Sequence, residues 1–448
     1  MLLLEITLLA LAAVVLVPVA VLCVECLAAA LPGRPRGGRD ASLNGASGDA
    51  TPPRPRVAVL IPAHNEEAGL PETLRSIRPQ MREGDRIVVV ADHCDDDTAG
   101  VARSSGCEVV ERSAVTSAGR GKGFALDTGL KHLAPDPPDV VVMVDADCRV
   151  EPLSVDALAR RAAETRRPVQ SAYMMAPSAS GGRENPRQLV SVLAILLKNY
   201  VRPRGLARLG CPCLLTGSGM AFPWHVIHAA PLASGNIVED MQLGLDLAMA
   251  GHPAVFCETA RITSLLPERD EAAARQRRRW EHGHLNTLFN QVPRLIWSGV
   301  ARGRLMSLPL ALELAVPPLS LLAAALAGAL AVSIVVAATT AVSWTAAAML
   351  AIGVVCLIAC VLLTWWRFGR EVVPFGALLS APWYVLWKAP IYASFLHRRE
   401  KQWQRTERAT GGTAGTTAPP PAGTEVPAPR APAPRDAKEE PADVAAGA

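Results

Sequence analysis

The chain has 448 residues, which is enough for one large domain with membrane segments or for two domains. Hydrophobic residues make up 50% of the chain, which is high for a soluble protein, and the net charge of +4 gives no case for nucleic acid as a partner. Ten cysteines show no zinc-type spacing, and most lie in apolar runs, which indicates buried thiols in a reducing compartment.

The chain begins with an apolar segment, residues 1–32, that is long enough to span a bilayer. A cleaved signal peptide is the alternative, but the segment lacks a basic start and is too long for one. Arg34, Arg36 and Arg39 follow it, so the positive-inside rule places the next part of the chain in the cytoplasm. Residues 33–55 are rich in Gly, Ser, Pro and Arg and predict a linker.

A regular alternation of strands and helices starts at residue 56. Apolar, β-branched runs predict strands at residues 57–61, 86–91, 107–111 and 140–144, with a helix between each pair. The last of these helices opens on the glycine-rich turn 119–123, which contains Lys122. Strand–helix alternation predicts an α/β domain with a mostly parallel sheet, which we place at residues 56–300 and which binds ligands at the carboxyl ends of its strands.

Acidic residues stand at this predicted edge. Asp145 and Asp147 directly follow the strand 140–144, and Asp92 ends an earlier strand. Two carboxylates one residue apart at the mouth of a buried strand are costly unless a positive group joins them. A hard divalent cation carrying a diphosphate is a natural partner, whereas the alternative is that the acids only cap the next helix.

Beyond residue 150 the pattern is looser. It predicts helices at 153–163 and 189–200, a strand at 169–174 and a small-residue loop at 216–220. The pair Glu239–Asp240 precedes an amphipathic helix.

An arginine-dense helix follows, around residues 276–280. Such a helix beside a membrane is usually a lipid-headgroup anchor, and we accept that interpretation for Arg277 and Arg278. For Gln276, Arg279 and Trp280 we favour a functional role, because they lie at a specific spacing downstream of the acids.

The region 301–408 is apolar again and predicts membrane spans at about 314–337 and 343–366. A third apolar block, 374–396, is interrupted by three prolines, which favours an interfacial or re-entrant segment with the tail inside. The tail 409–448 consists mainly of Ala, Pro, Thr and Gly and predicts disorder.

The motifs together resemble family 2 glycosyltransferases of the membrane-embedded kind, such as cellulose and poly-N-acetylglucosamine synthases. That family is marked by D, DxD, (T)ED and QxxRW, which correspond here to Asp92, Asp145-Ala146-Asp147, Glu239-Asp240 and Gln276 with Arg279-Trp280. The stretches IPAHNEE (61–67), GKGFAL (121–126) and TGSGMAF (216–222) add to the resemblance, which covers about residues 55–300. Val238 departs from the family's threonine but spares both acids.

The resemblance implies a GT-A-like nucleotide-diphospho-sugar transferase fold and a donor site. Asp92 would hydrogen-bond uracil, with Ala63 and Glu67 beside the base. Lys122 would approach the phosphates, although a lysine in a glycine turn is often only solvated. Asp145 would lie by the nucleotide and, with Asp147, would hold Mg²⁺ or Mn²⁺.

The resemblance also implies an acceptor site. Asp240 would be the general base, and Glu239 would orient the site. The loop carrying Gly217 and Gly219 would surround the acceptor. The last motif consists of Gln276, Arg279 and Trp280. Its side chains would bind the diphosphate and stack on the acceptor sugar.

The predicted function is that of an inverting UDP-sugar transferase that extends a β-linked exopolysaccharide, in several steps on one chain. It would be a multi-pass protein of the inner (plasma) membrane with its catalytic domain in the cytoplasm, alongside accessory export subunits. One alternative is a single transfer to a lipid acceptor. Another is a non-catalytic membrane subunit of a polysaccharide export complex, against which the intact acids and Gln-Arg-Trp set argue.

Overall fold

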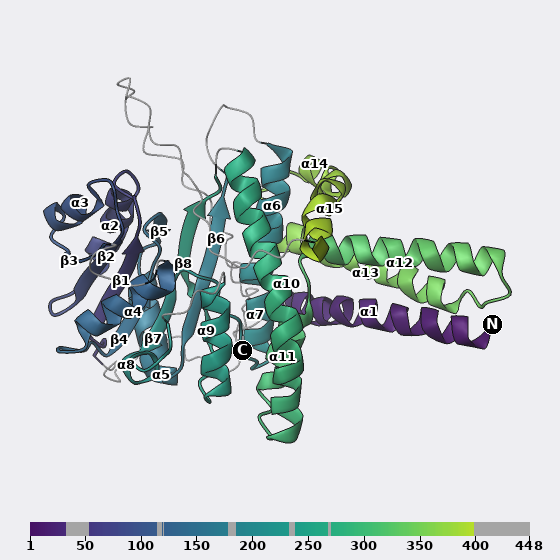
Figure 1. Cartoon of the computed structure of the whole chain (residues 1–448), viewed down its shortest axis with the longest axis horizontal. Helices are drawn as coiled ribbons and strands as arrows, with labels where there is room; N and C mark the ends of the chain where they lie inside the picture. Colours follow the sequence, from purple (N-terminus) through teal and green to yellow (C-terminus); the bar gives the residue numbers. More distant parts are fainter. Residues whose placement is uncertain are drawn as a thin grey trace, which may run out of the picture.

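The computed structural model describes residues 1–32, 53–113, 119, 121–177, 185–232, 238–267 and 270–397. Most of the predicted linker and the predicted tail therefore lie outside the described residues. An eight-stranded sheet occupies one end of the molecule, and long helices project from the other (Figure 1).

The first half of the sheet is parallel, as the alternation predicts. It consists of β1 (Val57–Ala63), β2 (Arg86–Asp92), β3 (Glu108–Arg112) and β4 (Val140–Met143), in the spatial order β3-β2-β1-β4. The crossovers are α2 (Leu70–Ile77) with a 3₁₀ turn (Arg78–Gln80), α3 (Thr98–Ser104) and α4 (Lys122–Leu133). All four residues of β4 are buried, because helices cover both faces of a parallel sheet.

The second half of the sheet is mixed, so the expectation of a mostly parallel sheet was wrong there. It contains β5 (Cys148–Val150), β6 (Val169–Ala176), β7 (Met220–Pro223) and β8 (Val255–Leu265). Strand β7 is antiparallel to both β4 and β6, and β5 is antiparallel to β8. Met220, the first residue of β7, pairs with Met143, the last residue of β4. The chain thus returns to the edge where β4 ends, and β7 has to run back in the opposite direction.

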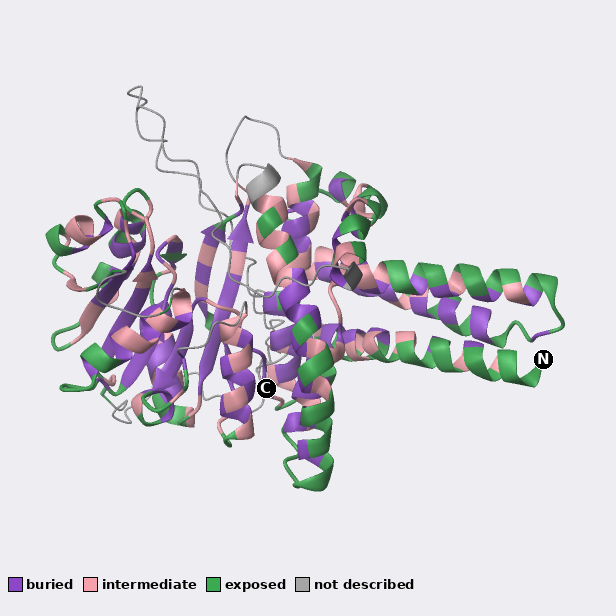
Figure 2. Ribbon diagram, viewed as in Figure 1, coloured by how far each residue is buried: buried purple, intermediate pink, exposed green. Residues whose placement is uncertain are grey.

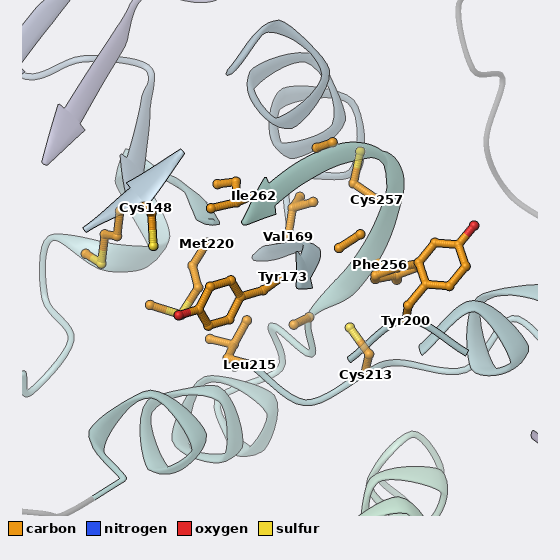
Figure 3. Packing of buried hydrophobic residues seen from close by; sticks show 14 of the residues in the cluster. Cys148, Val169, Tyr173, Tyr200, Cys213, Leu215, Met220, Phe256, Cys257 and Ile262 are labelled. Carbon is orange, nitrogen blue, oxygen red and sulfur yellow. The ribbon is translucent and has the colours of Figure 1, made fainter. Parts of the chain in front are cut away.

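Further helices connect the strands of the second half. They are α5 (Ser154–Thr165), α6 (Pro186–Leu196), a π-helix (Leu197–Val201), α7 (Arg202–Arg208), α8 (Trp224–Ile227) and α9 (Glu239–Met249). The predicted helix 189–200 is therefore part of a longer unit. Its Tyr200 packs edge-on against Phe256 of β8, with ring centroids 6.2 Å apart, beside the cluster around Tyr173 and Met220 (Figure 3).

Among the described residues, three helices are long and apolar enough to cross a membrane. They are α1 (Leu2–Ala30), α12 (Leu319–Thr339) and α13 (Thr345–Thr364) with its π-helical extension (Trp365–Gly369). These helices project side by side from the α/β domain, and their outer faces are exposed (Figures 1 and 2). Helix α12 starts five residues later than the predicted span at 314, because Pro317 and Pro318 separate it from α11 (Ser307–Ala315).

The remaining helices lie at the base of this projection. Helix α10 (Asp270–Ala301) and α11 run across it (Figure 1). The proline-interrupted block forms α14 (Phe375–Leu378) and α15 (Ala381–His397), and α15 packs against α6, α10 and α12. Whether this block is interfacial or re-entrant stays a prediction.

A buried ion pair fixes α1 to the α/β domain. The Glu25 carboxylate of α1 lies 2.5 Å from Nε of Arg202 on α7, and both side chains are buried. The Arg202 guanidinium also donates to the backbone oxygen of Glu313 at 2.8 Å. Gly205 lets α7 approach α1 closely, because a Cβ there would lie 2.0 Å from the Glu25 carbonyl oxygen. The position of α1 is therefore specified by contacts with the domain.

Candidate active site

A cavity of about 1820 Å³ opens between the carboxyl edge of the sheet and the wall formed by α6, α7, α9 and α10. All the residues that the sequence predicted for the site line this cavity, except Gly219. Gly219 lies behind the lining, where a Cβ would come within 2.0 Å of Ser171 Oγ, and its φ of +67° favours glycine. Its role is therefore to shape the turn into β7.

The acidic pair lies in the turn between β4 and β5. Oxygen and sulfur atoms of Asp145, Asp147 and Cys148 lie within 4.8 Å of one another. The hydroxyl of Ser264 donates to Asp147 Oδ2 at 3.2 Å, and the Asp145 backbone N–H donates to Ser218 Oγ at 3.1 Å. Two oriented carboxylates suit a hard divalent cation. Cys148 does not suit it, because burial and the neighbouring acids raise the pKa of its thiol well above the usual value.

Lys122, the first residue of α4, balances these acids. Its Nζ lies 2.5 Å from Asp145 Oδ1 and donates to the Gly217 carbonyl oxygen at 2.6 Å. Burial tends to lower the pKa of Lys122, but the carboxylates of Asp145, Glu239 and Asp240 outweigh burial and raise it. Burial raises the pKa of Asp145 in spite of this lysine. Lys122 therefore connects the sheet edge with the loop before β7.

Glu239 and Asp240 begin α9 on the other side of the same loop. A Cβ on Gly217, whose φ is +100°, would lie 3.0 Å from Asp240 Oδ2 and 3.9 Å from Lys122 Nζ. The glycine thus leaves room for the carboxylate and the lysine to approach. Burial, with a contribution from Asp240, raises the pKa of Glu239 to about 7. Glu239, which faces Lys122, is therefore protonated more readily than an ordinary glutamate.

Asp92, the last residue of β2, lines the cavity and has three positive or polar partners. Its carboxylate pairs with Arg112 and contacts His93 Nδ1 at 2.7 Å, while the Gly121 N–H donates to it at 3.3 Å. The sequence analysis missed Arg112, although Arg112 is the register partner of Asp92 on the adjacent strand β3.

The two remaining residues that the sequence predicted for donor binding lie beside this group. Ala63 ends β1, and the Glu67 carboxylate accepts from the Asp97 N–H at 3.2 Å.

The α10 motif lies across the cavity from the acids. Gln276, Arg279 and Trp280 all line the cavity, and Arg279 is close enough to lower the pKa of Glu239. The position of Arg277 differs from that predicted for a headgroup anchor. Arg277 lines the cavity, and its guanidinium lies 5.1 Å from the centre of the Trp387 ring of α15. Arg278 is exposed.

The sequence analysis also missed a group of charged and polar side chains at the end of the cavity nearest the projecting helices. They are Lys198, Arg202, Glu281, Tyr384 and Lys388. Only Lys198, Tyr384 and Lys388 carried a signal, because they are polar residues inside apolar stretches.

The sheet order and site define a GT-A-like fold, and comparison with solved structures supports this. The structure of the mannosyltransferase PcManGT from Pyrobaculum calidifontis, in complex with GDP-Man and Mn²⁺, has a TM-score of 0.51 and 21% identity, covering 86% of this chain and 99% of that chain. The family model described as "Glycosyltransferase like family 2" matches residues 53–283, more than half of the chain. The chain therefore belongs to glycosyltransferase like family 2.

Curated relatives match over a shorter stretch. A probable glycosyltransferase, YdaM, of Bacillus subtilis is 35% identical over 107 residues, 22% of this chain and 25% of that protein. The undecaprenyl-phosphate 4-deoxy-4-formamido-L-arabinose transferase of Pseudomonas paraeruginosa is 34% identical over 115 residues, 24% of this chain and 32% of that protein. The chain spans 25% to 40% of the length of the curated relatives it matches.

Proposed function

We propose that this protein is an inverting, metal-dependent glycosyltransferase that uses a UDP-sugar. The observation that carries the proposal is the arrangement of Asp145, Asp147 and Asp240 around one cavity, with Lys122 and Gly217 between the strand-end acids and Asp240. Membership of the glycosyltransferase family supports it. A non-catalytic subunit would have no need to maintain such a costly set of enclosed charges.

The donor is held along the sheet edge. Asp92, Ala63 and Glu67 bind the uracil end, and Lys122 approaches the phosphates. Asp147 and Asp145 hold Mg²⁺ or Mn²⁺, which when bound stabilises the charge that develops on the diphosphate.

The acceptor reacts on the other side of the cavity. Asp240 takes the proton from an acceptor hydroxyl as its oxygen bonds to the anomeric carbon and the bond from that carbon to the diphosphate breaks. This displacement inverts the anomeric carbon, so an α-linked donor gives a β-linked product. Glu239 orients the site.

Three residues of α10 complete the proposed site. Gln276 and Arg279 bind the diphosphate, and Trp280 stacks on the acceptor sugar.

The first candidate acceptor is a growing β-linked exopolysaccharide, extended in several steps before release. The resemblance of the motifs to polysaccharide synthases supports it, and the long cavity offers room for an acceptor sugar beyond the donor. In this case the protein would act with accessory export subunits.

The second candidate acceptor is a lipid that receives a single sugar. The name of the Pseudomonas relative, an undecaprenyl-phosphate transferase, supports it. So does the reach of the cavity, which extends to Leu22 of α1 and Leu319 of α12.

The setting of both reactions would be the inner (plasma) membrane, with residues 56–300 in the cytoplasm. Three apolar helices support this placement, because large apolar side chains on their outer faces are exposed, for example Val14, Val335 and Val355.

The deciding experiment is turnover in lipid-reconstituted protein with Mn²⁺, with UDP-glucose, UDP-N-acetylglucosamine and GDP-mannose offered separately and the product sized. A polymer from a UDP-sugar supports the first candidate, and a single sugar on lipid supports the second. Transfer from GDP-mannose alone would contradict the UDP-sugar assignment. No transfer from any donor, with Mn²⁺-dependent nucleotide binding also lacking, would contradict the proposal as a whole.

A further inference from the structure

Lys198 is a cation that the proposed reaction does not use. It belongs to the π-helix Leu197–Val201 between α6 and α7, and π-turns inside longer helices are frequent at functional sites. Its side chain is accessible from the cavity but is surrounded by protein. Burial lowers the pKa of Lys198; among the charges that act on it, Asp240 has the largest effect and raises the pKa, and Arg202 lowers it. Lys198 and Asp240 line the same cavity.

Apart from Asp240, the proposed base, the carboxylates in this part of the structure are engaged elsewhere. Glu281 pairs with Lys388, and Glu25 pairs with Arg202. Glu313 accepts from the Leu214 N–H at 3.0 Å. Within the described parts of the chain, no carboxylate lies within 4.0 Å of the Lys198 ammonium group. Lys198 is therefore an accessible cation in the cavity lining that no described carboxylate pairs with, so this part of the cavity favours an anionic ligand.

The other residues that line the cavity indicate what else such a ligand carries. Leu22 of α1 and Leu319 and Ser320 of α12 line the cavity together with Lys198. Among the described residues, two of the helices suited to cross a membrane therefore reach this cavity: α1 passes it at Leu22, and α12 begins at it. A ligand that carries both an anionic group and an apolar chain satisfies the lysine and these leucines together.

We propose that Lys198 binds the phosphate of a lipid phosphate-linked sugar, and that this sugar is the acceptor. The inference rests on the proposed sugar transfer and specifies its second candidate acceptor. A hydroxyl oxygen of the lipid-linked sugar bonds to the anomeric carbon of the donor, the bond from that carbon to the diphosphate breaks, and UDP leaves. The hydroxyl proton passes to Asp240, while the phosphate stays bound to Lys198 and its bonds are unchanged.

The test uses the full chain in phosphatidylcholine nanodiscs with the active donor and Mn²⁺. Two acceptors differ only in the phosphate: farnesyl phosphate-linked glucose and farnesyl glucoside. Lys198→Met is compared with Lys198→Arg and with Lys131→Met, a control at an exposed lysine of α4. We expect Lys198→Met to lower kcat/KM for the phosphate-linked acceptor about 10- to 100-fold, the range for loss of a charged hydrogen bond. Lys198→Arg should retain most of the activity, and UDP affinity should not change.

Several outcomes would overturn the inference. An equal loss with farnesyl glucoside, or no loss with either acceptor, would show that Lys198 does not recognise phosphate. Transfer onto farnesyl phosphate, which has no sugar hydroxyl, would contradict the anchoring role. Inhibition by inorganic phosphate that disappears in Lys198→Met, without any preference between the two acceptors, would indicate a free-anion site.

A second experiment measures binding alone, so that failure of this inference can be told apart from failure of the proposed function. If no donor is turned over, native mass spectrometry of the farnesyl phosphate-linked glucose complex still compares the wild type with Lys198→Met. If the wild type binds this acceptor and Lys198→Met does not, the lysine assignment is supported even though transfer has failed. Equal binding by the two proteins overturns the assignment.

Discussion

Replacing Lys122 with methionine tests the charge balance at the centre of the proposed site. Lys122 Nζ contacts Asp145 Oδ1 at 2.5 Å and the Gly217 carbonyl oxygen at 2.6 Å. Methionine keeps most of the side-chain volume but leaves Asp145 beside Asp147 with no lysine between it and Asp240. Without a bound cation, the site would then hold several acids close together.

The size of the effect follows from the burial of the pair. Removing one partner of a buried ion pair costs about 3–5 kcal/mol. The side chains of Lys122 and Asp145 are 19% and 28% exposed to solvent. We therefore take the lower end of this range of costs, about 3 kcal/mol. For a domain of this size, about 1 kcal/mol shifts Tm by about 2–4 °C, which predicts a drop of about 6–12 °C.

The matched control is Lys131→Met on the same helix. Lys131 is 76% exposed and pairs with Asp127 at 2.8 Å, and surface pairs of this kind contribute about 0–1 kcal/mol. Thermal unfolding followed by tryptophan fluorescence should be recorded for both variants in EDTA and in Mn²⁺. Mn²⁺ should raise the Tm of Lys122→Met more than that of the wild type, since the cation replaces the lost charge. Equal drops for the two variants, or equal Mn²⁺ shifts in Lys122→Met and the wild type, would refute the reasoning.

Three further predictions concern single residues. Asp240→Asn should lower kcat about 10²–10⁴-fold while UDP affinity measured by calorimetry stays constant, and retained turnover would rule out Asp240 as the base. Asp147→Ala should abolish Mn²⁺-dependent UDP binding, so UDP affinity that still responds to EDTA as in the wild type would break the metal assignment. Burial raises the pKa of Glu313 to about 8, so the folded protein binds a proton that the unfolded chain has lost, and stability should fall as pH rises from about 4.5 to about 8. Glu313→Gln should flatten this decline in Tm, and an unchanged pH profile would contradict the assignment.

The parallel half of the sheet was readable from the sequence because its signals are local. Short β-branched runs such as 140–144 form strands wherever helices cover both faces, and the acids that follow them necessarily reach the carboxyl edge. The strand ends moved by one or two residues; β1, for example, extends to Ala63.

The mixed half was not readable, because strand direction depends on where the intervening chain returns. The run from Val144 to Gly219 comes back to the carboxyl end of β4, which reverses β7. Four-residue and three-residue strands such as β7 and β5 are also too short to show a period.

The sequence by itself placed the acids at a sheet edge and, through the spacing of its motifs, indicated a nucleotide-sugar transferase. Only the tertiary structure brought Lys122 between Asp145 and Gly217, paired Arg112 with Asp92, and brought Lys198 into the lining of the cavity. The physical reason is that a motif fixes which groups follow a strand or helix over a few residues. The partner of a charge, and hence its pKa and its availability to a ligand, depends on contacts between segments far apart in the chain.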